Sequence, residues 1–67
     1  MNKLTIEFSD VDLISIYNVV GENIKTIVVQ NGQTKAEINA ADFREGIYFY
    51  AILKEGVVIE TRKIVKN

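Results

Sequence analysis

Apolar and polar residues alternate with a period of two along most of this 67-residue chain. Near the start, Leu4, Ile6 and Phe8 alternate with Thr5 and Glu7. Side chains on a strand point to opposite faces in turn, so this alternation predicts a strand with one buried face. The residues that follow, 9–12, predict a connection because they are mostly polar.

A second strand is predicted from Leu13 to Asn18. Ile14 and Ile16 fall on one side, and the other side carries Leu13, Ser15 and Tyr17. Gly21, followed by Glu-Asn, predicts the turn that ends this element, since glycine accepts positive φ without steric cost.

A hairpin is predicted around Asn31-Gly32. Residues 24–30 are rich in β-branched side chains that suit a strand, and residues 33–38 resume the extended pattern. Asn-Gly between two such runs favours a type I′ turn, which needs positive φ at both central positions. The pattern therefore predicts that these two strands pair with each other.

Residues 39–45 could form a helical turn, which is too short to be stable alone. Gly46 ends it, and a strand from Ile47 to Lys54 follows, with the odd positions expected on the core face and the even positions opposite. Glu55-Gly56 predicts the last turn and residues 57–65 the last strand. We expect the core to form around five residues: Ile14, Ile16, Ile47, Phe49 and Ile59.

Short strands at regular spacing with tight turns are typical of all-β folds. The chain is therefore predicted to be a small antiparallel Ig-like β-sandwich of six to seven strands, forming one domain over residues 1–67.

Composition narrows the possible chemistry. The chain has no cysteine, histidine, proline or tryptophan, so it lacks thiolate metal ligands and the usual general base. A net charge of −1 argues against strong attraction to nucleic acid or anionic lipid. No cofactor, resident metal or enzymatic activity is expected, and no apolar run reaches the roughly 20 residues of a membrane span.

Several short motifs occur in a recognisable order. Residues 14–21 read Ile-Ser-Ile-Tyr-Asn-Val-Val-Gly, residues 46–48 read Gly-Ile-Tyr, and residues 63–66 read Lys-Ile-Val-Lys. Together with Leu4 to Glu7 and the polar turn at residues 31–34, this set resembles the type A C-terminal sorting domain of the type IX (Por) secretion system. The resemblance covers nearly the whole chain, although the Pro-containing segment with which such domains usually begin has no counterpart.

That resemblance implies a role. Such domains direct an attached cargo protein from the periplasm through the type IX translocon of Bacteroidetes-like bacteria, to the cell surface or the medium. A sortase-like peptidase then commonly removes them. We therefore expect this domain to be excised from a larger secreted protein.

The resemblance also assigns a recognition signal, which comprises six residues: Gly46, Tyr48, Lys63, Ile64, Val65 and Lys66. For four of them a structural role is the alternative: Gly46 as a glycine with positive φ, Tyr48 as a tyrosine half-buried on a sheet, and Lys63 and Lys66 as lysines on the solvent face of an edge strand, where they discourage aggregation. If these residues form the recognition signal, replacing residues 63–66 should abolish export and leave the domain mostly folded. Phe49→Ala should instead unfold the domain.

The sequence also contains two other candidate binding sites, one for calcium and one for sugar. Asp10 and Asp12, with Glu7 or Asp42, could bind calcium, although a solvated turn is the more ordinary explanation. The second site consists of Tyr17, Tyr48 and Tyr50, which could form an aromatic platform for sugar, although packing at sheet edges with solvent-exposed hydroxyls is the simpler explanation. The alternative functions are thus an extracellular spacer, a carbohydrate-binding or adhesion module, or self-association through strand edges.

Overall fold

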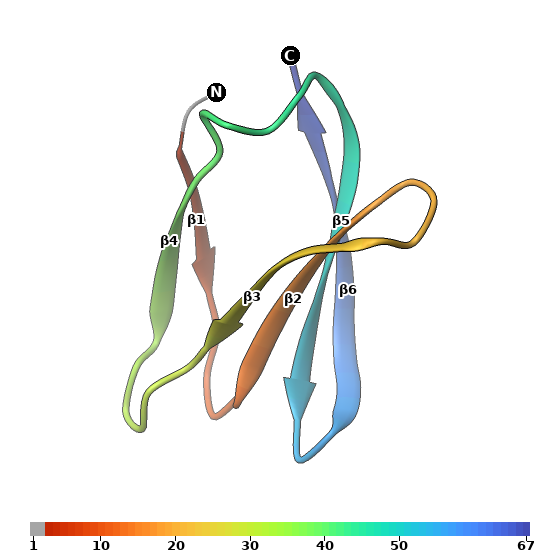
Figure 1. Cartoon of the computed structure of the whole chain (residues 1–67). Coiled ribbons are helices and arrows are strands. Elements are labelled where there is room, and N and C mark those ends of the chain that lie inside the picture. The colour runs from red at the N-terminus through yellow and green to blue at the C-terminus, as the bar shows by residue number, and fades with distance from the viewer. Residues whose placement is uncertain (1–2) are drawn as a thin grey trace.

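The computed structural model describes residues 3–67, so the first two residues of the expected domain lie outside the described part. Six strands make up the fold: β1 (Lys3–Glu7), β2 (Leu13–Asn18), β3 (Asn23–Val28), β4 (Lys35–Asn39), β5 (Gly46–Lys54) and β6 (Val57–Lys66). They form two antiparallel sheets, β1-β4 and β3-β2-β5-β6 (Figure 1). The predicted all-β antiparallel sandwich is confirmed.

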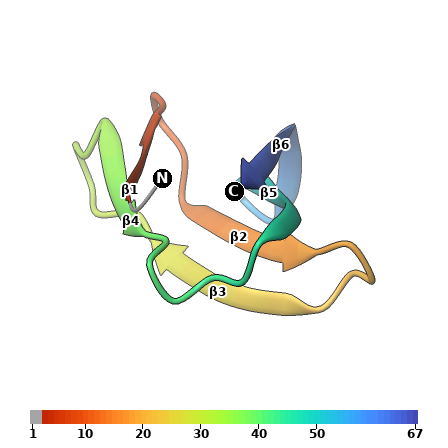
Figure 2. The same ribbon diagram turned by 90° about the horizontal axis from the view of Figure 1, so that it is seen from above.

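The two sheets form the two layers of the sandwich (Figure 2). Between them lie the fully buried side chains of Ile14, Ile16 and Ile38, one pair from β2 and one residue from β4. Ile6 of β1 and Ile64 of β6 belong to the same cluster of buried residues. The prediction that Ile14 and Ile16 share the core face of their strand is confirmed.

The core face of β5 is opposite to the one predicted. Tyr48 and Ile52 are buried, whereas Ile47 and Phe49 are 39% and 36% exposed. Ile59, also expected in the core, is 55% exposed and lies at a β-bulge in β6 opposite Ile52/Leu53. Both faces of β5 carry apolar side chains, so alternation alone could not identify the inner one.

The predicted hairpin over residues 24–38 does not form. β3 pairs with β2 and β4 pairs with β1, so the chain crosses from one layer to the other between them. The turn itself exists, because the Gln33 amide donates to the Gln30 carbonyl at 3.0 Å. Gly32 has φ +85° but Asn31 does not have positive φ, so this is not a type I′ turn.

The other turns follow the prediction more closely. Glu55 and Gly56 have φ of +51° and +78°, as a two-residue type I′ hairpin between β5 and β6 requires. Gly21 also has positive φ. Residues 40–45 form an irregular turn rather than the helical turn considered above, held by a bond from the Phe43 amide to the Ala40 carbonyl at 3.1 Å.

Candidate recognition site

The two motifs nearest the carboxyl end lie side by side in the β5–β6 ladder. Gly46 is opposite Lys66, and Tyr48 is opposite Ile64. Directly opposed residues of an antiparallel pair project to the same face of the sheet. The fold thus joins the Gly-x-Tyr segment and the terminal Lys-Ile-Val-Lys segment into one structural unit.

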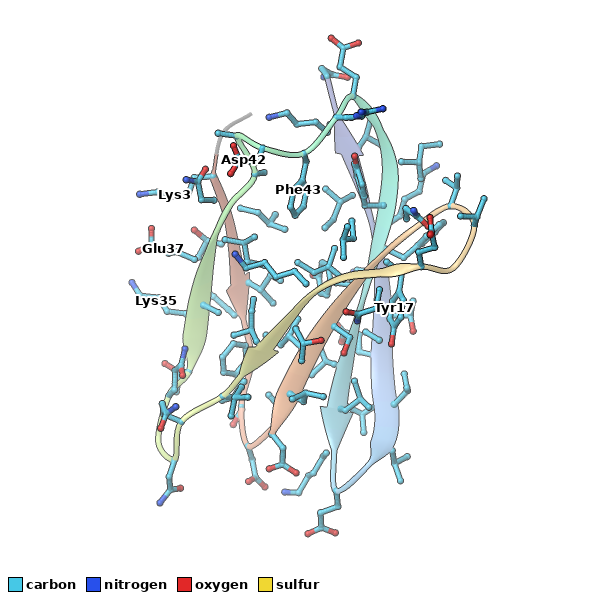
Figure 3. All side chains as sticks on the ribbon, viewed as in Figure 1. Lys3, Tyr17, Lys35, Glu37, Asp42 and Phe43 are labelled. Carbon is cyan, nitrogen blue, oxygen red and sulfur yellow. The ribbon has the colours of Figure 1, made fainter. Side chains whose placement is uncertain are left out.

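Tyr48 is a buried anchor for the loop that precedes β5. Its side chain is 8% exposed, and its hydroxyl donates to the Arg44 carbonyl oxygen at 2.6 Å. The Phe43 ring packs against it with centroids 5.1 Å apart, and Phe43 reaches from the loop toward the interior (Figure 3). The expectation of a half-buried tyrosine with a wet hydroxyl is therefore wrong for Tyr48.

Lys66 binds the start of the same loop, residues 40–45. The residue is buried, and its Nζ donates to the Ala40 carbonyl oxygen at 2.8 Å. A buried ammonium needs such partners because desolvating an unpaired charge is costly. The expectation of a solvent-facing lysine is wrong for Lys66, but Lys63 is exposed as expected.

Gly46 allows the chain to enter β5. Its φ is +147°, a conformation that residues with a Cβ rarely adopt, and a Cβ placed there would meet nothing within 4 Å. The backbone conformation, and not crowding, is therefore what requires glycine. The predicted structural role of Gly46, ending a loop with positive φ, is confirmed.

The six predicted signal residues divide into two groups. Gly46, Lys63 and Val65 are exposed, whereas Tyr48, Ile64 and Lys66 are buried. Replacing the whole segment 63–66 would remove buried side chains together with exposed ones. The expectation that such a variant stays mostly folded is therefore inconsistent with the burial of Ile64 and Lys66. The expectation that Phe49→Ala unfolds the domain is inconsistent with a different observation, since Phe49 is 36% exposed and is not a core residue.

The acidic turn considered for calcium uses its carboxylates within the protein. Asp10 pairs with Lys54, and the pKa of Lys54 is raised first by that hydrogen bond. Asp12 Oδ2 accepts the Glu55 backbone amide at 2.6 Å. Among residues 3–67, no three acidic, cysteine or histidine side chains come together as a metal site would require.

The three tyrosines do not form one aromatic platform. Tyr17 is on the outer face of the larger sheet, whereas Tyr48 and Tyr50 are on the core face of β5. A sugar stacking on all three rings is therefore excluded by their separation onto opposite faces of the sheet.

Asn18 is a structural residue whose role the sequence motif only partly indicated. Its Oδ1 accepts the amides of Val20 at 3.1 Å and Glu22 at 2.9 Å, and its Nδ2 donates to the Glu22 carboxylate at 2.8 Å. An asparagine three residues before a glycine is the signal for such a side-chain-closed turn. The result is a hydrogen-bonded β2–β3 loop that leaves Val19 and Val20 exposed.

A cavity of about 430 Å³ lies between the β1–β2 connection and the turn after β3. Its lining includes Asp10 and Asp12, which already have protein partners. This cavity is thus at the end of the sandwich far from the Gly46–Lys66 pair, and it brings together none of the predicted signal residues.

No helix suited to crossing a membrane occurs among the described residues. Searches among curated proteins and among solved structures gave no match. Comparison with protein families matches residues 1–67, the whole chain, to the family described as the secretion system C-terminal sorting domain. This match agrees with the motifs paired in the β5–β6 ladder, and the chain belongs to the family of type IX secretion C-terminal sorting domains.

Proposed function

We propose that this domain acts as an address that the type IX translocon reads in its folded form. Membership of the sorting-domain family indicates a signal for export to the cell surface or the medium. The domain would carry its cargo ahead of β1 and present its own last hairpin, β5–β6, to the export machinery. Transit through the periplasm and later removal by a sortase-like peptidase belong to the same proposal and follow from the resemblance.

The cross-strand pairing of the two motifs is the observation that carries this proposal. Gly46 and Tyr48 are held opposite Lys66 and Ile64, so the terminal segment has a defined shape only when β5 and β6 are folded. Among the strands of residues 3–67, β6 pairs with β5 alone and thus forms an edge of the larger sheet. Edge strands can accept a further strand from a receptor.

The test is a reporter carrying a Sec signal at its start and residues 1–67 at its end, expressed in a host with the type IX system. We expect the reporter on the cell surface or in the medium of the wild type, and in the periplasm of a strain without the translocon. Ile16→Asp places a charge in the core and serves as the unfolded control, because Ile16 has no exposed surface.

Retention in both strains, with the domain shown by circular dichroism to be folded, would reject the sorting function. An extracellular spacer or adhesion module would then be the better explanation.

A further inference from the structure

The outer face of the larger sheet, which points away from β1 and β4, is nearly uncharged. The strand registers arrange its side chains in rows that run across the sheet. One row is Val28, Leu13, Leu53 and Val58. The next contains Thr26, Ser15, Ala51 and Thr61, and the third contains Asn23, Tyr17, Phe49 and Lys63; a last pair, Ile47 and Val65, follows.

Lys63 is the one charged residue among these fourteen. It forms no ion pair with any residue in the described part of the chain. Phe49 lies directly opposite it on β5, and Ile47 and Val65 form the adjacent cross-strand pair. These three apolar side chains are 36%, 39% and 52% exposed.

Contiguous exposed apolar side chains on a protein surface are a feature of interaction sites. Burying it against a partner would also remove Lys63 from water, which is costly unless the partner supplies an opposite charge. We propose that the cluster of Ile47, Phe49, Lys63 and Val65 docks an apolar surface of a protein component of the export machinery that places a carboxylate opposite Lys63. This proposal rests on the proposed sorting function and assigns its recognition surface.

A second copy of the chain is a poorer occupant. A two-fold axis through Phe49 would bring two Lys63 side chains within roughly 10 Å of each other, twice the spacing between neighbouring strands. That juxtaposition of like charges opposes a dimer and favours an acidic partner.

The attached cargo is also a poorer occupant. The chain enters the described structure at Lys3, in the other layer, and Tyr17 lies on the side of the larger sheet away from that layer (Figure 3). A cargo joined ahead of β1 would leave the outer face of the larger sheet accessible to the machinery.

The experiment measures export of the reporter for surface variants of the full 67-residue domain. The test variants are Lys63→Glu, Lys63→Gln, Lys63→Arg and the double variant Ile47→Thr/Val65→Thr. Threonine keeps high strand propensity, so the double variant removes apolar surface with little effect on folding. Matched controls lie off the cluster: Lys25→Glu for charge and Val57→Thr, with 62% exposure, for apolar area.

We expect export to be highest for Lys63→Arg, lower for Lys63→Gln and lowest for Lys63→Glu. The loss relative to the wild type should be on the order of tenfold for Lys63→Glu and for the double variant. Lys63→Arg and both controls should be exported as the wild type is. Thermal unfolding of each purified domain must show that all variants are folded.

Wild-type export of folded Lys63→Glu and of the double variant would overturn this proposal and leave the sorting function intact. A wild-type domain that fails to be exported would instead reject the sorting function, and this proposal with it. Sedimentation of the wild type as a dimer that Ile47→Thr/Val65→Thr converts to a monomer would also overturn it, because the cluster would then bind a second copy.

Discussion

Tyr48 and Ile64 lie directly opposite each other in the β5–β6 ladder, and both side chains are buried, with 8% and 5% exposure. One belongs to the Gly-x-Tyr motif and the other to the terminal segment. Motif residues at these positions therefore support the fold before any receptor is involved. Effects of their substitution on export must be separated from effects on folding.

The Tyr48 hydroxyl provides a first test of that support. Tyr48→Phe removes the bond to the Arg44 carbonyl, leaves the ring in place, and should lower the free energy of unfolding by about 0.5–1.5 kcal/mol. Urea denaturation measures this difference. Tyr17→Phe is the matched control, since no hydrogen bond of the Tyr17 hydroxyl is found among the described residues; equal losses in both variants would contradict the anchor role.

Ile64 and Phe49 should respond differently to truncation. Ile64→Ala creates a cavity in the core and should cost about 2–5 kcal/mol. Phe49→Ala should cost less, roughly 1–2 kcal/mol, because the Phe49 side chain is already partly in water. A larger loss for Phe49→Ala in chemical denaturation would mean that the core face of β5 is the opposite one.

The conformation of the Glu55-Gly56 turn predicts one stabilising and one destabilising substitution. Glu55 has φ +51°, a conformation that asparagine adopts more readily than glutamate. Glu55→Asn should therefore stabilise the domain by about 0.4–1 kcal/mol, and Gly56→Ala, at φ +78°, should destabilise it by a similar amount or more. Thermal unfolding of the two variants should show shifts of opposite sign, and shifts of the same sign would argue against the type I′ turn.

Lys66 and Lys63 belong to one motif, but replacing them should affect the stability of the domain differently. Lys66→Met removes the bond to the buried Ala40 carbonyl and should destabilise the domain by about 1–3 kcal/mol. Lys63→Met changes an exposed side chain, so its effect should stay within about 0.5 kcal/mol. Equal losses in denaturant titrations would contradict the assignment of Lys66 as the structural lysine.

Stability should fall in alkaline solution. Burial, with a smaller contribution from Glu60, raises the pKa of Tyr50 above its ordinary value of 10.0, although Arg62 opposes the shift. The folded state then holds this proton more tightly than the unfolded state, so the stabilisation is present below pH 10 and is lost as pH rises through the folded-state pKa. The pKa of Lys54 is also raised, which acts in the same direction.

Tyr50→Phe should reduce the slope of the unfolding free energy against pH above about pH 10. Tyr17→Phe serves again as the control. An unchanged slope in Tyr50→Phe would show that Tyr50 does not contribute to the alkaline dependence.

The positions of β-strands followed from local alternation, but their partners did not. Residues 24–38 contain two strand-forming runs around Asn31-Gly32, and a local hairpin was the natural expectation. The chain instead uses this turn to change layers, so β3 joins β2 and β4 joins β1. Pairing over such distances depends on which strands bury apolar surface together, and turn residues alone do not encode that choice.

Local patterns in the sequence were enough to predict the all-β class, the six strand segments, the turns at Gly46 and Glu55-Gly56 and, through the ordered motifs, the sorting-domain family. Local patterns did not show that Tyr48 and Ile52 face the core while Ile47 and Phe49 face outward, which depends on how the two sheets pack. The physical reason is that both faces of β5 are apolar, so only packing of the larger sheet against β1 and β4 selects the inner one. The same packing buries Ile64 and Lys66 and leaves Lys63 exposed among apolar neighbours.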